Sequence, residues 1–369
     1  MEHNAPTVDS PTYVLTPNPA PASDAERARR MDSQPFGTVF TDHLARASWD
    51  VDAGWHRRRV EPFSDLVLHP GATVLHYGQQ VFEGLKAYRW GDGSIHLFRP
   101  EANAARLAAS AVRMALPPLP EEDFLASIEA LLTADAHWVP DAEETSLYLR
   151  PMLIGTEPCL GVRPSRTVEY LLLASPVGAY FPNGVKPVSI WVAQGYHRAG
   201  NGGTGQAKTA GNYAASLLPQ QQAQDHGCDQ VLFLDAARDT YVEELGGMNV
   251  FAVRRDGTVW TPRVTGTILE GVTRASVIQL LRADGREVIE RDISITELRE
   301  GIESGAITEL FACGTAAVVT PMARLVAPDY DVVVGDGGPG TATMALRQRL
   351  TDIQWGRDED RFGWMRRVV

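Results

Sequence analysis

The lysine at position 208 stands in a stretch whose residue types could carry covalent chemistry. A glycine-rich loop at 200–205 comes before it, and a helix-like run follows it. A lysine amine is nucleophilic only in its neutral form, and a buried, crowded site favours that form. Lys208 is therefore predicted to bond covalently to a carbonyl group.

Other residues supply what a cofactor with a reactive carbonyl needs. Pyridoxal phosphate (PLP) requires a lysine to form a Schiff base, an acid at its pyridine nitrogen and a cradle for its phosphate. Glu244 is the candidate acid, because a carboxylate there keeps the ring protonated and able to take up electrons. Thr273 at a predicted helix start, Thr315 in a turn of small residues and Arg99 after a strand-like run are candidates for the phosphate.

Two glycine patterns near the lysine have other interpretations. Gly200-x-Gly202-x-x-Gly205 matches a dinucleotide-binding pattern, but several residues separate it from the preceding strand-like run, so a mobile loop is favoured. Gly202-(x4)-Ala207-Lys208-Thr209 is close to a P-loop, and Asp235 ends an apolar run downstream, where a magnesium ligand would stand. Ala207 replaces the last glycine, which the tight turn around a phosphate requires. An NTP-binding protein remains the alternative from a different class.

Composition limits the classes of partner. The chain has 369 residues and a net charge of −12, which argues against nucleic acid or an anionic membrane as a main partner. Its three cysteines are far apart, which predicts a reducing, cytoplasmic setting. No apolar run approaches the ~20 residues of a membrane span. No metal site is predicted, and the expected partners are small molecules.

The chain is predicted to have an α+β (mixed α/β) fold in two domains. Residues 1–32, rich in proline, are expected to form a mobile N-terminal extension, and 33–175 a small α/β domain. Residues 176–187 are predicted to be a linker and 188–369 a large domain that binds PLP. Residues 72–77 are predicted to form a strand. Apolar periodicity predicts helices at 101–114, 121–137, 272–282 and 341–353.

Taken together, these segments resemble the branched-chain amino acid aminotransferases, PLP enzymes of fold type IV in the class IV aminotransferase family. The resemblance runs from about Phe36 to the C-terminus. Its motifs stand at 36–43, 76–88, 97–100, 147–151, 208–213, 244–249, 271–274 and 314–316. The implied fold is the two-domain fold type IV, like that of D-amino acid aminotransferase.

The resemblance implies a role for each matched cofactor residue. Lys208 is implied to be the Schiff-base lysine and to move the proton between the substrate Cα and the cofactor C4′. Tyr213 would hydrogen-bond the 3′-oxygen of the cofactor, Glu244 its pyridine nitrogen, and Leu269 would pack on the ring. The implied phosphate contacts are Arg99, Val272 through its backbone amide, Thr273 and Thr315.

The resemblance also implies a substrate site. The implied contacts of the α-carboxylate are Tyr77, Thr315 and Ala316. Phe36, Phe82 and Tyr148 would wall an apolar side-chain pocket, with Arg150 at its edge for the second carboxylate of glutamate. Leu160 and Val162 would reach the pocket of a neighbouring subunit, so a homodimer is expected. Ala317 and Thr320 stand where mammalian relatives carry a CxxC redox pair, so regulation by that pair is not expected.

The function implied is transfer of an amino group between leucine, isoleucine or valine and 2-oxoglutarate. D-amino acid aminotransferase and aminodeoxychorismate lyase are the alternatives with the same fold. Tyr77, Phe82 and the Tyr148-x-Arg150 pair favour the branched-chain enzyme.

Overall fold

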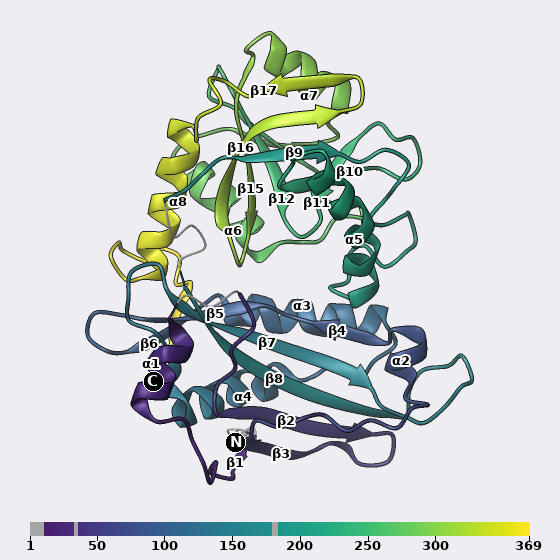
Figure 1. The fold of residues 1–369 in the computed structure, drawn as a ribbon, viewed down its shortest axis with the longest axis vertical. Helices are drawn as coiled ribbons and strands as arrows, with labels where there is room; N and C mark the ends of the chain where they lie inside the picture. Colours follow the sequence, from purple (N-terminus) through teal and green to yellow (C-terminus); the bar gives the residue numbers. More distant parts are fainter. Residues whose placement is uncertain (1–10, 33–35, 179–183) are drawn as a thin grey trace, which may run out of the picture. The chain divides into compact units, whose positions relative to one another are not determined.

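The computed structural model describes residues 11–32, 36–178 and 184–369, and the chain divides into two units (Figure 1). The first unit comprises residues 1–178 together with 366–369, and the second comprises 179–365. The division falls within the segment 176–187 that the sequence assigns to a linker. The return of 366–369 to the first unit was not anticipated. Both units combine a sheet with helices, so the α+β class is confirmed.

The first unit is built on a mostly antiparallel sheet. The strand order is β1-β3-β2-β8-β7-β5-β6-β18, and β4 pairs with β7. The strands are β1 (Val14–Leu15), β2 (His43–Asp50), β3 (Gly54–Pro62), β4 (Gln80–Phe82), β5 (Leu85–Arg89), β6 (Ile95–Phe98), β7 (Ser146–Gly155), β8 (Thr167–Val177) and β18 (Met365–Arg367). The helices are α1 (Asp24–Met31), α2 (Thr73–Tyr77), α3 (Pro100–Arg113), α4 (Glu121–Ala134) and the short 3-10 turn η1 (Ala136–Trp138).

The two faces of this sheet have different neighbours because successive strand residues point to opposite sides. On β7, Leu147 and Leu149 belong to the large core formed with α3 and α4, which includes Leu107 and Phe124. The alternate residues of β7 face the other side, where Ile154 joins a smaller apolar cluster. Tyr148 and Arg150 share that parity with Ile154, so β7 presents both of them on the face away from the main core.

The N-terminal segment differs from the expected mobile extension over the part that the structure describes. Residues 14–15 pair in parallel with β3, and α1 follows. The Asn18 backbone N–H donates to His43 Nε2 (2.9 Å), and the Ala22 N–H donates to Asp42 (2.9 Å). Tyr13 is also buried in the main core, and Met31 packs against it. Polar contacts and this apolar packing together hold residues 11–32 on the first unit. Residues 1–10 lie outside the described part of the chain.

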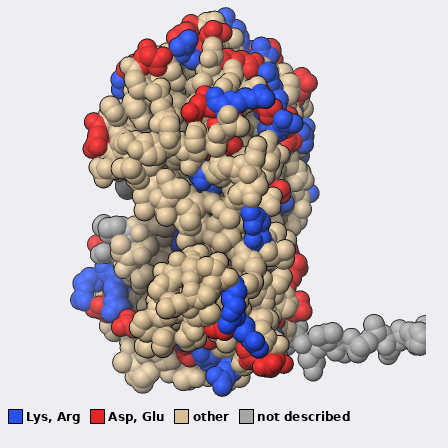
Figure 2. Space-filling model, turned by 90° about the vertical axis from the view of Figure 1, so that its right-hand side faces the viewer, with Lys and Arg blue, Asp and Glu red and all other residues tan. Residues whose placement is uncertain are grey.

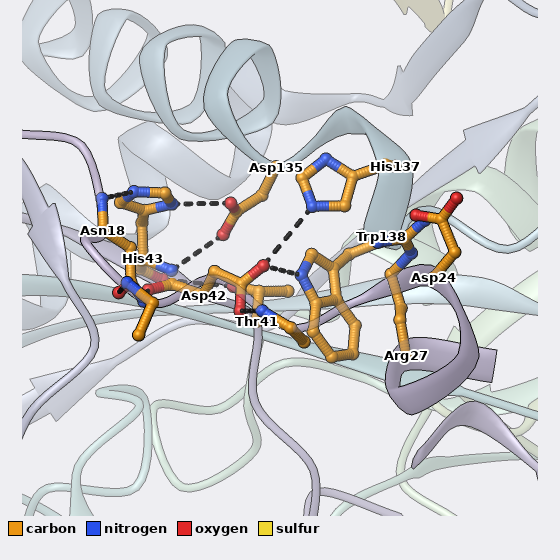
Figure 3. A network of polar contacts seen from close by, with 11 residues as sticks. Asn18, Asp24, Arg27, Thr41, Asp42, His43, Asp135, His137 and Trp138 are labelled. Atoms are coloured by element: carbon orange, nitrogen blue, oxygen red, sulfur yellow. Dashed lines mark hydrogen bonds and ion pairs between the residues drawn. The ribbon is translucent and has the colours of Figure 1, made fainter. Parts of the chain in front are cut away.

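These contacts belong to a buried polar network around Asp42 and Asp135 (Figure 3). Trp138 Nε1 donates to the second oxygen of Asp42 (2.8 Å). Asp135 accepts from the His43 backbone N–H (2.9 Å) and contacts His43 Nδ1 (2.7 Å). Oxygen atoms of Asp42 and Asp135 and a ring nitrogen of His137 lie within 4.8 Å of one another. Each carboxylate oxygen already has an N–H partner, so the network joins the N-terminal segment, β2 and η1.

The last residues of the chain complete the first unit. β18 follows β6 in the strand order. The Ile95 N–H donates to the Val369 carbonyl (2.9 Å), and the Val368 N–H donates back to Ile95 (2.8 Å). Arg366 pairs with Glu101 at 2.8 Å. Residues more than 260 positions apart in sequence are therefore neighbours here.

The second unit is built on a sheet that closes on itself. Its order is β11-β10-β9-β16-β15-β12-β13-β14, β17 pairs with β16, and β11 also pairs with β12. The strands are β9 (Val188–Val192), β10 (Gln230–Leu234), β11 (Val242–Leu245), β12 (Asn249–Arg254), β13 (Val259–Pro262), β14 (Val288–Arg291), β15 (Ile307–Gly314), β16 (Val318–Ala327) and β17 (Tyr330–Val333). The helices are α5 (Ala210–Asp225), α6 (Val272–Ala283), α7 (Ile295–Glu303) and α8 (Thr341–Gln354). The β11–β12 pairing closes a ring, which brings the strand ends near Glu244 and Asn249 together.

One predicted element is wrong in type. Residues 73–77, expected as part of a strand, form the helix α2. Gly78 ends that helix in the left-handed conformation (φ 57°), and its N–H donates to the Val74 carbonyl. A glycine takes this conformation without steric cost, so the turn at Gly78 outweighs the strand preference of Thr73 and Val74.

Among the described residues, no helix is both long and apolar enough to cross a membrane. On the face of the molecule in Figure 2, basic and acidic side chains are interspersed.

Candidate active site

Lys208 lies at the start of α5, in the second unit. Thr209 is the N-cap of that helix, and Lys208 Nζ donates to the Tyr213 hydroxyl at 2.7 Å. The amine also lies 5.0 Å from the centre of the Tyr213 ring. The first turn of α5 therefore brings the predicted nucleophile, Lys208, into contact with the phenol of Tyr213.

Glu244 is the most deeply buried carboxylate of this region and has three donors. Its residue is 3% exposed. One oxygen accepts from the Leu269 N–H (2.9 Å) and pairs with Arg198 Nη2 (2.6 Å). The other accepts from Asn249 Nδ2 (3.2 Å). Burial raises the pKa of Glu244 to about 7, although the Arg198 cation and the Leu269 N–H act to lower it. Lys208 is among the cations that act on this carboxyl group.

Asn249 connects Glu244 with the start of α6. Its Nδ2 also donates to the Leu269 carbonyl (3.0 Å). A Cβ atom on Gly271, the N-cap of α6, would lie only 2.1 Å from Asn249 Oδ1, so glycine is needed there. Among the described residues, no side chain caps α6. The first N–H groups of a helix have no partner within the helix, so those of Val272 and Thr273 are suited to an anion.

The turn with Thr315 and Ala316 lies beside the same strand end. β12 and β15 are antiparallel with Asn249 opposite Cys313, so 314–316 follow directly. A Cβ on Gly314 would approach Met248 Cγ to 3.2 Å. The second unit therefore gathers the predicted cofactor residues Lys208, Tyr213, Glu244, Leu269, Val272, Thr273 and Thr315, together with Ala316, around the β11–β12 turn.

The loop at 200–205 is held in place, which differs from the mobile loop expected. Arg198 donates to the Gly205 carbonyl (2.9 Å) and to the Thr267 carbonyl. Thr204 donates to Asn212 of α5 (2.7 Å), and Asn212 donates back to the Thr204 carbonyl (2.8 Å). A Cβ atom on Gly205 would lie 2.4 Å from the Thr267 carbonyl oxygen, so this glycine allows the loop to pack against that backbone.

Asp235 does not stand free as a magnesium ligand would. Its carboxylate accepts the backbone N–H groups of Arg238, Thr240 and Tyr241. Burial acts to raise the pKa of Asp235, but these hydrogen bonds outweigh it and the pKa is lowered. Asp235 therefore organises the turn after β10, and the P-loop interpretation loses its second element.

In the first unit, Phe36, Tyr148 and Arg150 line one cavity of about 330 Å³. The Phe36 and Tyr148 rings meet edge to face at 4.9 Å. Arg150 Nη2 donates to the Tyr148 hydroxyl (2.8 Å), and the guanidinium lies 4.6 Å from the centre of the Phe82 ring. A Cβ on Gly84 would lie 2.1 Å from the Tyr148 hydroxyl, so this glycine permits the position of Tyr148.

This cavity contains polar atoms that lack a partner. Arg150 Nε and the Ser175 hydroxyl are buried, and neither has a hydrogen-bond partner among the residues that the structure describes. A buried donor without an acceptor is unfavourable, and a carboxylate is the natural acceptor for a guanidinium. An otherwise apolar cavity with one such cation can take either an aliphatic group or a second carboxylate.

Tyr77, Leu160 and Val162 form a separate group in the first unit. The Tyr77 hydroxyl donates to the Leu160 carbonyl. Leu160 is 70% exposed, Val162 85% and Tyr77 40%.

Arg99 is the N-cap of α3 in a left-handed conformation (φ 50°), and burial lowers the pKa of its guanidinium.

Sequence reasoning missed Arg198 and Asn249. Asn249 lies within the 244–249 motif, five residues from Glu244, so its proximity was available from the tight turn between two short strands. Arg198 is in an irregular segment ten residues before Lys208, and no periodicity identifies it. Only the fold reveals that its side chain, 4% exposed, contacts Glu244.

The chain is similar to proteins of one known family. The family model described as Amino-transferase class IV matches residues 80–325. The branched-chain-amino-acid aminotransferase of Mycolicibacterium smegmatis is 52% identical over 360 residues, which cover 96% of this chain and 98% of that protein. The crystal structure of branched-chain amino acid aminotransferase from Escherichia coli matches with a TM-score of 0.73 and 28% identity, covering 89% of this chain and 99% of that one. The enzyme of that name from Thermobaculum terrenum, in its PLP form, matches with a TM-score of 0.74 and 26% identity, covering 89% and 99%.

The first prediction concerns Arg198. Replacing it with Met removes a charge-assisted hydrogen bond from Glu244, worth roughly 1.5–3 kcal/mol, so PLP affinity should fall roughly 10- to 100-fold. Without the cation, the pKa of Glu244 rises further above its ordinary value, so the loss of affinity on acidification should begin at a higher pH than in the parent. Titration of the cofactor-free protein with PLP across pH 6–9, followed by absorbance, measures both effects.

The Arg198→Lys variant is the control, because it keeps a cation and should recover part of the affinity. Equal PLP affinity and equal pH dependence in the parent and in Arg198→Met would contradict a role for Arg198 in holding Glu244.

Proposed function

The chain belongs to the class IV aminotransferases and, within them, to the branched-chain-amino-acid aminotransferases, and on this premise we propose which residues carry its reaction. It is a PLP-dependent enzyme that transfers the amino group between leucine, isoleucine or valine and 2-oxoglutarate. D-amino acid aminotransferase, aminodeoxychorismate lyase and an NTP-binding protein are not favoured by this membership.

The observation that carries the proposal is the buried Glu244 carboxylate with its three donors near the Lys208–Tyr213 pair. Bound PLP supplies an electrophilic carbonyl and a protonated ring that takes up electrons when a substrate Cα loses its proton. The residues fit that group. Ionised Glu244 would accept from the pyridinium N–H, and the Tyr213 hydroxyl would donate to the 3′-oxygen. Leu269 would pack on the ring.

The phosphate would be held mainly by backbone and hydroxyl groups. The N–H groups at the start of α6 (Val272 and Thr273) and the Thr273 and Thr315 hydroxyls are proposed donors. The positive end of the helix dipole adds to their attraction for a dianion. Arg99 is proposed as a further contact, because a guanidinium can bind two phosphate oxygens at once.

Lys208 is proposed to hold and move the proton of the reaction. In its neutral form the amine would accept the proton from the substrate Cα and would donate it at the position of the cofactor C4′. The 2.7 Å contact with Tyr213 sets the position of Nζ. This general acid–base role accounts for a factor of roughly 10²–10⁴ in rate.

The substrate side chain is proposed to lie against Phe36, Phe82 and Tyr148. This apolar surface suits a branched aliphatic group, and Arg150 would receive the second carboxylate of glutamate. The α-carboxylate is proposed to contact Tyr77, Thr315 and Ala316. A pocket that is apolar apart from one arginine accounts for acceptance of both substrate classes.

The second prediction tests the function through Lys208. The purified protein should be yellow with PLP, and adding L-leucine alone should lower the visible band while a pyridoxamine band rises. Lys208→Ala should fold normally by circular dichroism and lose turnover by at least the roughly 10²–10⁴-fold expected for a general acid–base residue. Turnover of D-alanine without turnover of L-leucine would contradict the substrate class, and normal rates in Lys208→Ala would contradict the lysine assignment.

The third prediction concerns Arg150. Arg150→Ala should lower kcat/KM for glutamate and 2-oxoglutarate roughly 10- to 100-fold, because a carboxylate would lose a charge-assisted partner worth roughly 1.5–3 kcal/mol. Leucine serves as the control within the same enzyme and should be affected much less. Steady-state kinetics with both substrates measures the difference, and equal losses would mean that Arg150 is structural.

We propose that two copies of the chain form the working enzyme. Leu160, Val162 and Leu75 are exposed by 70%, 85% and 59%, and large apolar side chains gathered on a surface favour contact with a partner. Tyr77 contacts Leu160, so it is proposed to act with this group and to reach the site of the second copy.

The fourth prediction tests this association. Leu160→Asp places a charge in the proposed interface and should shift the sedimenting species from two chains towards one at micromolar concentration. Val112→Asp changes an equally exposed residue (66%) on α3 and should leave the species unchanged. A parent protein that sediments as a single chain would contradict the homodimer.

A cytoplasmic location is also proposed. Cys159, Cys228 and Cys313 are free, and Cys313 is buried. Burial raises the pKa of Cys313 to about 12, so this thiol stays protonated and unreactive. Free thiols suit a reducing compartment, and recovery of the protein in a membrane or extracellular fraction would contradict the location.

A further inference from the structure

A second cavity lies in the second unit. It has a volume of about 320 Å³. Its lining comes from the end of β9, the last residue of β10, the turn at Asp239, the start of α7 and the turn between β16 and β17. Figure 1 shows α7 and β17 together at one end of this unit. None of the residues assigned above to the cofactor or the substrate lines it.

Arg299 and Tyr330 supply two donor atoms to this cavity. Among the described residues, Arg299 Nε is buried without a hydrogen-bond partner and forms only a long ion pair with Glu303, at 3.9 Å. The guanidinium lies 5.3 Å from the centre of the Tyr330 ring. The Tyr330 hydroxyl is likewise buried without a hydrogen-bond partner in the described part of the chain. A carboxylate is a suitable acceptor for each of these donors.

Carboxylates and apolar groups complete the lining. Asp239 and Asp329 carry negative charge, and Asp239 lies 3.6 Å from His197 Nδ1. Burial, with a contribution from Asp329, raises the pKa of Tyr330 to about 12, so its hydroxyl stays a donor at neutral pH. Val192 and Leu234 are 2% and 5% exposed and give the cavity an apolar wall.

We propose that this cavity binds a free aliphatic α-amino acid as a second, non-catalytic site. The α-carboxylate pairs with Arg299 and Tyr330, and the ammonium pairs with Asp239 or Asp329. The aliphatic side chain packs on Val192 and Leu234. Each part of such a molecule has a partner here. The cation and the phenol suit the α-carboxylate, the two carboxylates suit the ammonium, and the apolar wall suits the side chain.

A ligand in the cavity restrains residues 194–198, which precede Lys208 in the chain. Val192 and Gln194 in the lining are followed by His197, which contacts Asp239, and then by Arg198. A bound amino acid that engages Asp239 therefore restrains the stretch 194–198. Hydrogen exchange of the peptide that covers this stretch should slow when the site is filled.

The fifth prediction uses the full-length enzyme with its cofactor in the amine form, prepared with L-glutamate and dialysed. In this form the cofactor has no carbonyl to react with an added amino acid. Calorimetric titration with L-valine should show one saturable site per chain. Arg299→Met should weaken it at least tenfold, and Tyr330→Phe, which removes only a hydroxyl, should weaken it severalfold. Arg282→Met, at an exposed arginine of the same unit, should bind as the parent does.

The outcomes separate this site from the catalytic one. L-valine binding that is equal in the parent, Arg299→Met and Tyr330→Phe would place the ligand in the active site and overturn the proposal, as would the absence of saturable binding. Binding of 3-methylbutyrate as tightly as L-valine would overturn the ammonium contact and leave a carboxylate site. Failure of L-glutamate to convert the cofactor would count against the proposed function, whereas the variant comparison would still report on the cavity.

Discussion

The site in the second unit depends on keeping one buried carboxylate ionised. Burying a charge is costly unless donors surround it, and Glu244 is 3% exposed. The Leu269 N–H, the Asn249 amide and the Arg198 guanidinium supply those donors. Each donor comes from a different segment, so the needs of one side chain fix the relative positions of the loop before Lys208, the β11–β12 turn and the approach to α6. Because its pKa is about 7, the Glu244 carboxyl group has comparable ionised and protonated populations at neutral pH.

The first unit has an apolar surface with one cation, Arg150, which forms no ion pair within the described part of the chain. Arg150 is held by the Tyr148 hydroxyl and by aromatic rings. These contacts stabilise a guanidinium less than a carboxylate does, so the group keeps its capacity for an incoming ligand. Its strand position explains the arrangement. Tyr148 and Arg150 are two residues apart on β7 and project from the face away from the main core, where Gly84 leaves space.

Local signals in the sequence predicted the long helices well. The helices expected at 101–114 and 272–282 are found at Pro100–Arg113 and Val272–Ala283, because a proline and a glycine mark their starts and apolar periodicity marks their length. Lys208 and Glu244 stay predicted site residues, and both were chosen for the chemistry of their own side chains. The start of α6 after Gly271 was predicted from a local signal as well. Tertiary contacts account for two of the differences. Hydrogen bonds to His43 and Asp42 order the N-terminal segment, and Arg198 contacts Glu244 across 46 positions of the chain. The third difference is local, because the left-handed turn at Gly78 ends α2.

The return of β18 to the first unit also constrains the order of events during synthesis. The sheet of that unit gains its edge strand beside β6 only after residues 365–369 have left the ribosome, long after the rest of the sheet has been made. Until then, the outer edge of β6 exposes unpaired backbone groups, which are a hazard for association with other nascent chains. The second unit, whose residues lie between the two parts of the first, is complete before that edge is covered. Residues 365–369 thus cover the edge of a strand, β6, that was synthesised about 270 residues earlier.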